Sequence, residues 1–204
     1  LCHSDLSVIN GDRPRPMPMA LGHEAAGVVE ALGPDVTDLA VGDHVVMVFM
    51  PSCGHCAPCA EGRLALCEPG AKANGEGVLL TGRRAFVCED GPQLNHHLGC
   101  SAFATHAVVS RRSLVKIDKD ISFEHAALFG CAVLTGVGAV VNSAALKAGQ
   151  SAVVIGLGGV GLAAVLGALA AGASPVVAVD LNPDKLALAA SFGVVHTVNA
   201  SDHD

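Results

Sequence analysis

The sequence predicts an α/β protein with two domains, a β-rich domain over residues 1–125 and a doubly wound parallel sheet over residues 126–204. Three observations lead to this fold class. The first part carries short β-branched runs that are broken by Gly, Pro and Asp. The second part alternates strand-like and helix-like segments, and a glycine-rich turn follows its first strand. A length of 204 residues is sufficient for two modest domains.

In the first domain we expect strands at residues 25–32, 43–50 and 103–110, where β-branched residues gather. Residues 33–43 read as a turn-rich connection. Residues 70–100 are rich in glycine and show little periodicity, so we expect a long excursion there.

The second domain reads as β-α-β-α-β after one apolar helix that we expect to be buried, at residues 126–144. Pro183 at the start and Gly193 at the end bound the last predicted helix. The predicted strands lie at 151–156, 175–180 and 194–199, and the predicted helices at 160–172 and 183–193.

Composition excludes several classes of partner. The chain is 51% hydrophobic and carries a net charge of −7, which argues against nucleic acid or an anionic membrane as a partner. Residues 148–179 carry no charge, but Pro175 and several glycines divide them into strand-like and helix-like pieces. We therefore interpret this stretch as a buried α/β core rather than as a membrane span.

Four closely spaced cysteines are the strongest local signal. The loop contains Cys53, Cys56, Cys59 and Cys67, with two, two and seven residues between successive cysteines. Four thiolates in one short loop suit a closed tetrahedral zinc site. An iron–sulfur cluster also takes four cysteines, so the spacing leaves the metal open. A disulfide framework is the weaker alternative, because adjacent C-x-x-C pairs bridge poorly.

A glycine-rich turn predicts a dinucleotide site. Gly156, Gly158 and Gly161 fit G-x-G-x-x-G between a strand and a helix, with Gly159 and Val160 inside the motif. Asp180 closes the second strand, where an acid binds both ribose hydroxyls and repels a 2′-phosphate. The sequence therefore favours NAD over NADP. The alternative is a glycine-rich turn without a ligand.

Three further segments carry potential metal ligands: Cys2-His3-Ser4-Asp5, Gly22-His23-Glu24, and Cys131. Taken singly, a buried cysteine is usually a small core residue and a buried histidine is usually packing. The residues by themselves do not establish that these segments converge.

The motifs CHSD, GHEAAGVV, CGHCAPC…C, FGC…TG and GLGGVG resemble, in order and spacing, those of zinc-dependent medium-chain alcohol dehydrogenases. The resemblance covers nearly the whole chain. It implies a GroES-like β-barrel catalytic domain followed by a Rossmann cofactor domain. It also implies an oxidoreductase that transfers hydride between an alcohol or aldehyde and NAD, and a homodimer.

By resemblance, Cys2, His23 and Cys131 hold a catalytic zinc with one position open for water or substrate, and Cys131 comes from the cofactor side of the interdomain cleft. The four-cysteine loop would hold a structural zinc, giving two zinc ions per chain. The resemblance also implies roles around the metal: Ser4 hydrogen-bonds the substrate oxygen, Glu24 lies behind the metal and Asp5 orients His23. For the cofactor, it implies that His3 contacts the pyrophosphate, Thr135 contacts the nicotinamide and Lys185 contacts the adenosine ribose. Phe49 would line the substrate pocket or the barrel core.

Two departures from the family pattern bear on the activity. Ser7 stands where a histidine often ends the proton relay. Residues 68–72 lack the arginine of glutathione-dependent formaldehyde dehydrogenases. The alternatives are therefore a glutathione- or mycothiol-type formaldehyde dehydrogenase, a zinc-free reductase of the same superfamily, and a non-enzymatic zinc- and dinucleotide-binding protein. A zinc-free reductase should lack Cys2, His23 and the cysteine loop.

The chain begins at Leu1 and ends in a polar run, so we expect both ends to be truncated and the activity to belong to a longer form. The metal sites account for six of the eight thiols, with Cys88 and Cys100 left over. This usage favours a reducing, cytoplasmic compartment.

Overall fold

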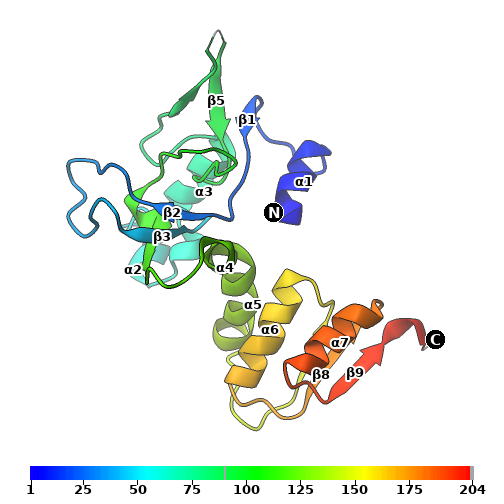
Figure 1. Cartoon of the computed structure of the whole chain (residues 1–204). Helices are drawn as coiled ribbons and strands as arrows, with labels where there is room; N and C mark the ends of the chain where they lie inside the picture. The colour runs from blue at the N-terminus through cyan, green and yellow to red at the C-terminus, as the bar shows by residue number, and fades with distance from the viewer. Residues whose placement is uncertain (90, 203–204) are drawn as a thin grey trace. The chain divides into compact units, whose positions relative to one another are not determined.

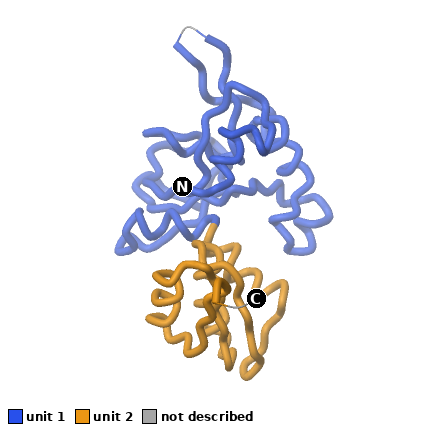
Figure 2. The backbone as a smooth tube through the Cα atoms, turned by 90° about the vertical axis from the view of Figure 1, so that its right-hand side faces the viewer, with its two compact units in different colours: residues 1–131 blue, residues 132–204 orange. Residues whose placement is uncertain are grey.

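The computed structural model describes residues 1–89 and 91–202, and the chain forms two compact units, Leu1–Cys131 and Ala132–Asp204 (Figure 2). The boundary between the two units lies between Cys131 and Ala132. The domain bounds expected from the sequence, 1–125 and 126–204, stay a prediction. Each unit is described by itself.

Unit 1 contains two three-stranded sheets (Figure 1). The first has the order β1-β5-β4, with β1 at Met19–Ala20, β4 at Phe86–Val87 and β5 at Gln93–His96. The second is antiparallel with the order β2-β3-β6, formed by Ala26–Val28, His44–Met47 and Leu114–Ile117. Val45 and Val46 of the central strand β3 are both buried, so this strand carries the core of the second sheet.

The strands that the structure describes in unit 1 stay in two separate sheets and do not close into the expected barrel. The strand predicted at residues 103–110 is wrong, because these residues run as irregular chain. A cavity of about 660 Å³ is lined by residues 104–109 on one side and by β2 on the other. No described strand ladder pairs residues 103–110 with β2, and a strand needs such a hydrogen-bonded neighbour.

The excursion expected at residues 70–100 contains regular structure. Helix α3, Glu68–Glu76, begins after Cys67, whose Sγ accepts a hydrogen bond from Gly70 N–H. It ends at Gly77, whose φ of 67° is the left-handed conformation typical of helix ends. Strands β4 and β5 follow as a short antiparallel hairpin. The sequence hid the helix because its cap is a cysteine sulfur and its interior holds glycines, which disfavour helix.

The other helices of unit 1 are short, and each lies close to or contains a candidate metal ligand in the sequence. They are α1 at His3–Ile9, α2 at Ala57–Ala60 and α4 at Phe123–Leu128, with 3₁₀ turns at Leu64–Leu66 and Arg111–Ser113.

Helix α4 continues through a π turn, Phe129–Val133, into α5, Leu134–Gly138, and a second π turn, Ala139–Ser143. This run of 21 residues has a mean hydropathy of 1.7, so by length and composition alone it is long enough to cross a membrane. A core helix passes the same test. The expectation of a buried helix is wrong on one side, since Leu128, Leu134 and Val141 are exposed.

The buried side of this run is its glycine side. A Cβ at Gly130 would lie 1.8 Å from the Met47 carbonyl oxygen, and one at Gly136 would lie 2.3 Å from that of Val160. Glycine therefore lets other backbone segments approach the helix closely, while the larger apolar residues point outward.

Unit 2 confirms the β-α-β-α-β prediction. Its strands β7, β8 and β9 are parallel and lie in that order, which places each consecutive pair side by side. The strands are Ala152–Ile155, Val176–Asp180 and His196–Asn199, the helices are α6 at Gly159–Ala170 and α7 at Pro183–Ser191, and a 3₁₀ turn follows at Ala200–Asp202. The uncharged stretch 148–179 is thus strand, helix and strand. Its core centres on Leu157, Val165 and Ala178.

Candidate metal and cofactor sites

The four clustered cysteines meet in space as predicted. The sulfurs of Cys53, Cys56, Cys59 and Cys67 all lie within 4.8 Å of one another, and the Cys56 and Cys67 sulfurs are 4.0 Å apart. The edge of a tetrahedron with zinc–sulfur bonds of 2.3 Å is about 3.8 Å. The cluster therefore has room for one ion, whereas an iron–sulfur cluster would hold its cysteines further apart. All eight cysteines, each in the described part of the chain, are free thiols.

Backbone amides surround this cluster. Cys67 Sγ accepts from Cys53 N–H and Gly70 N–H at 3.2 and 3.3 Å, and Cys53 Sγ accepts from His55 N–H and Cys56 N–H at 3.5 and 3.3 Å. The amide of His55, with that of Cys56, lowers the pKa of the Cys53 thiol to about 6. Burial raises the pKa of Cys59 to about 11. Four thiolates so close together need a cation to offset their repulsion, so the donor set fits zinc.

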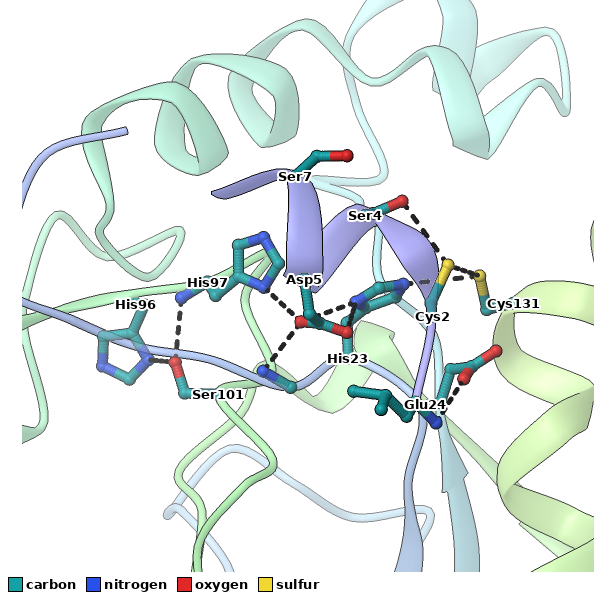
Figure 3. A network of polar contacts seen from close by, with 12 residues as sticks. Cys2, Ser4, Asp5, Ser7, His23, Glu24, His96, His97, Ser101 and Cys131 are labelled. Carbon is teal, nitrogen blue, oxygen red and sulfur yellow. Dashed lines mark hydrogen bonds and ion pairs between the residues drawn. The ribbon is translucent and has the colours of Figure 1, made fainter. Parts of the chain in front are cut away.

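A second cluster joins residues that are far apart in the sequence (Figure 3). Cys2 precedes α1, His23 lies between β1 and β2, and Cys131 follows α4. Cys131 Sγ is 3.4 Å from His23 Nε2 and 4.0 Å from Cys2 Sγ. For one zinc ion these separations would be about 3.6 and 3.8 Å. The predicted convergence of the three residues is confirmed, and zinc binding there stays a prediction.

Asp5 determines which ring nitrogen of His23 faces this cluster. His23 Nδ1 lies 3.3 Å from Asp5 Oδ1 and 3.2 Å from Oδ2, and both side chains are buried. A carboxylate at this distance keeps the proton on Nδ1 and leaves the Nε2 lone pair directed at the two sulfurs. His23 is therefore presented as a metal ligand through Nε2.

The environment of Cys131 disfavours its thiolate form unless a cation is bound. Burial, with the nearby Cys2 and Glu24, raises the pKa of the Cys131 thiol to about 12. Without a cation it would stay protonated at neutral pH, while a bound divalent ion would stabilise the thiolate. The Glu24 carboxylate lies beside this sulfur, and the role behind the metal that the resemblance implies for it stays a prediction.

Two other predicted residues, Ser4 and Phe49, contact members of the same cluster. Ser4 Oγ is 3.5 Å from Cys2 Sγ. The Phe49 ring packs edge-on against His23, with ring centroids 6.1 Å apart. Ser7 Oγ donates to the His3 carbonyl oxygen at 3.1 Å, and the His3 side chain is exposed on α1.

His97 contacts this site and was missed by the sequence analysis. Its Nδ1 lies 3.1 Å from Asp5 Oδ1 and its ring packs edge-on against His23. Burial lowers the pKa of His97, so the ring is neutral. The only signal in the sequence was a pair of histidines in the glycine-rich excursion, and no spacing rule links such a pair to Asp5.

The glycine-rich turn of unit 2 has the geometry that an anion site needs. Gly156 follows β7 with a φ of 88°, and a Cβ at Gly161 would lie 1.8 Å from the Gly156 carbonyl oxygen. Gly161 thus allows α6 to start against the turn. Gly158 precedes α6 and has no side chain to cap it, so the first amides of the helix remain for a phosphate.

Asp180 is tied to this turn. Its Oδ2 accepts from Leu157 N–H at 2.6 Å and its Oδ1 accepts from Asn182 N–H at 2.9 Å. These amides lower the pKa of the Asp180 carboxyl group, which keeps it charged. Lys185 Nζ lies 3.8 Å from Asp180 Oδ2, and Thr135 is exposed on α5.

Comparisons with known proteins show the family to which the chain belongs. Residues 1–119 match the family model described as alcohol dehydrogenase GroES-like domain, and residues 159–204 match the model described as zinc-binding dehydrogenase. The chain belongs to the zinc-dependent medium-chain alcohol dehydrogenase family. Its fold is accordingly the GroES-like and Rossmann combination of that family.

Similar proteins include S-(hydroxymethyl)glutathione dehydrogenases of Synechocystis sp. and Escherichia coli, each 42% identical over the whole chain and 55% of the relative. Among solved structures, an alcohol dehydrogenase zinc-binding domain protein from Burkholderia ambifaria is 42% identical with a TM-score of 0.94. Benzyl alcohol dehydrogenase from Acinetobacter calcoaceticus is 37% identical with a TM-score of 0.88. Each alignment covers all of this chain and 55% of the other. The chain thus spans about half the length of these relatives.

Proposed function

We propose that the protein is an oxidoreductase that transfers hydride between an alcohol or aldehyde and NAD, with two zinc ions per chain. The observation that carries this proposal is the convergence of Cys2, His23 and Cys131 beside the buried Asp5. Two soft sulfurs and one imidazole suit zinc, and three protein ligands leave a fourth position for substrate, as catalytic zinc sites require.

When bound, the zinc would supply a Lewis acid that lowers the pKa of an alcohol, and NAD would accept the hydride. The protein's own groups then position and deprotonate the substrate. Ser4, beside Cys2, would accept the substrate hydroxyl proton and pass it on. Ser7 Oγ donates a hydrogen bond to the His3 carbonyl oxygen and so does not replace the relay histidine of the family; the ribose hydroxyls of a bound cofactor would supply the onward path to water. Phe49 would shield the apolar side of the substrate.

Asp180 should determine the choice of cofactor. The Asp180→Gly variant removes a charge that would repel a 2′-phosphate, and it leaves Lys185 to pair with that phosphate. We expect the ratio of kcat/KM for NAD to that for NADP to fall by about 100-fold, which corresponds to about 3 kcal/mol. The control is Asp184→Asn, which removes an exposed acid at the start of α7 and should leave the ratio unchanged. A wild-type protein that already prefers NADP would contradict the assignment.

Two glycine variants should separate folding from cofactor binding. Gly161→Ala places a methyl group against the Gly156 carbonyl, so we expect a loss of about 1–3 kcal/mol in stability together with weaker NAD binding. A Cβ at Gly158 meets no atom within 4 Å, so Gly158→Ala should keep the wild-type melting temperature and lose NAD affinity alone. Thermal unfolding and NADH titration measure the two effects. Equal NAD affinity in wild type and Gly158→Ala would argue against a phosphate at this turn.

The substrate class has a second candidate. The names of the Synechocystis and Escherichia coli relatives favour S-(hydroxymethyl)glutathione, an adduct with two carboxylates. In the stretch where an arginine would bind such an adduct, this chain offers Lys72, which lies 3.9 Å from Glu76 and is therefore already close to a carboxylate. We accordingly favour a simple alcohol or aldehyde.

Zinc analysis combined with NADH formation on a substrate panel tests the proposal. The panel should include ethanol, benzyl alcohol and S-(hydroxymethyl)glutathione. Two zinc ions with turnover of the simple alcohols supports the main proposal, and turnover restricted to the glutathione adduct supports the second candidate. Zinc without turnover of any alcohol would favour a binding protein. The proposal includes a homodimer and a reducing, cytoplasmic compartment, where the ligand thiols stay reduced.

A further inference from the structure

We propose that His97 is a positioning residue for the Cys2–His23–Cys131 metal site: through Asp5 it fixes the orientation and the tautomer of His23. This inference rests on the proposed catalytic zinc. It assigns a role to a side chain that lies 3.1 Å from Asp5 and belongs to a segment remote in sequence from all three ligands.

Asp5 is the centre of the argument. This carboxylate is fully buried, and a buried charge is costly unless several donors satisfy it. Its Oδ1 accepts from Gly22 N–H at 3.0 Å and from His23 Nδ1 at 3.3 Å. His97 Nδ1 approaches the same oxygen at 3.1 Å. The carboxylate is thus held from three sides, and the direction in which it faces His23 depends on all three.

His97 is held as firmly as the carboxylate it contacts. Its side chain is 1% exposed, and its ring lies at 81° to the His23 ring with centroids 5.6 Å apart. Its backbone N–H donates to Ser101 Oγ at 2.9 Å. Neither ring nitrogen of His97 has a well-aligned hydrogen-bond partner among the described residues, so the contact with Asp5 is the 3.1 Å approach of Nδ1 to Oδ1.

The backbone around His97 is strained in a way that serves this placement. Leu98 and Ser101 have φ values of 54° and 50°, a conformation that side chains other than glycine adopt at a cost of about 1 kcal/mol or more each. Ser101 also lies 3.5 Å from His96 Nδ1, and His96 Nε2 accepts from Ala85 N–H at 3.0 Å. The strained turn therefore brings Ser101 and His97 into one buried polar network that ends at the metal ligands (Figure 3).

Removing the contact of His97 Nδ1 with the Asp5 carboxylate should loosen Asp5 and, through it, His23. Groups that orient a metal-bound histidine typically change metal affinity by about 10–100-fold when they are lost. His97→Phe keeps a ring and removes both nitrogens. His97→Asn keeps an amide nitrogen near the position of Nδ1, and its loss of Nε2 removes no described hydrogen bond. His97→Gln instead carries its amide to the position of Nε2, away from Asp5.

The experiment measures metal retention rather than activity. The protein is loaded with ¹¹³Cd²⁺, and its two resonances, one for four sulfurs and one for two sulfurs and a nitrogen, are followed during titration with a chelator. We expect His97→Phe and His97→Gln to shift the second resonance and to lose that metal at about 10–100-fold lower chelator concentration, with the four-sulfur resonance unchanged. His97→Asn should behave like wild type.

A matched control is His44→Phe. His44 is a half-buried histidine on β3 that packs against Phe123 of α4 and takes no part in the network. If His97→Phe fails to fold, the polar pair His97→Asn and His97→Gln still decides the question. Equal metal retention in these two variants would overturn the inference and leave His97 as packing. A wild-type protein that binds only the four-sulfur metal would instead overturn the proposed function.

Discussion

Cys131→Ala is expected to lower the zinc content from two ions to one per chain and to reduce alcohol turnover by at least about 10³-fold. The reason is that Cys131 Sγ completes the cluster with His23 Nε2 at 3.4 Å and Cys2 Sγ at 4.0 Å. Two remaining ligands hold zinc poorly, and the lost charge stabilisation is worth several kcal/mol in the transition state. Metal analysis and steady-state kinetics of the full-length protein measure both effects.

Cys100→Ala is the matched control for this prediction. Cys100 is also a buried cysteine, with its Sγ 3.7 Å from the Val48 carbonyl oxygen, and it is outside both metal clusters. Its loss should lower stability and keep both zinc ions.

In Cys131→Ala the melting temperature, NADH binding and the four-cysteine zinc should be preserved. Near-normal turnover of Cys131→Ala would make Cys131 a core residue, and the dehydrogenase mechanism would have to be abandoned.

Cys67→Ser is expected to release the structural zinc and to destabilise the protein by at least about 3 kcal/mol, because structural zinc supplies folding free energy on the order of 10 kcal/mol. Cys67 is fully buried, and its sulfur accepts hydrogen bonds from the amides of Cys53 and Gly70. It therefore joins the loop to the start of α3. For a chain of this size we expect the melting temperature to fall by about 10 °C.

Cys88→Ser tests whether the effect belongs to the cluster, since Cys88 is a half-buried cysteine that neither cluster includes. This variant should keep the wild-type melting temperature and zinc content. A strong chelator should lower the melting temperature of wild type toward that of Cys67→Ser and should have little further effect on the variant. If the chelator leaves the wild-type curve unchanged while zinc is lost, the four-cysteine site contributes no folding energy.

Local patterns predicted unit 2 almost completely. The alternation of strand and helix, Pro183 at the start of α7 and the G-x-G-x-x-G turn are short-range signals, and the parallel order β7-β8-β9 follows from them. The four-cysteine cluster was equally local, because its ligands lie in one loop that can close on a single ion. Unit 1 was predicted less well. Its helix α3 is capped by a sulfur, and the irregular segment 103–110 has the composition of a strand.

By itself, the sequence determined the α/β fold class, the four-cysteine cluster and the glycine-rich turn, because each depends on residues that are close together in the chain. The residues by themselves did not show that Cys131 meets His23 across 108 residues; the family resemblance implied it and the tertiary structure established it. Tertiary structure alone showed that His97 reaches Asp5. It also decided that one side of the apolar run 123–143 stays exposed. Contacts of this kind depend on how separate elements pack, and packing leaves no periodicity or spacing in the sequence from which they could be predicted.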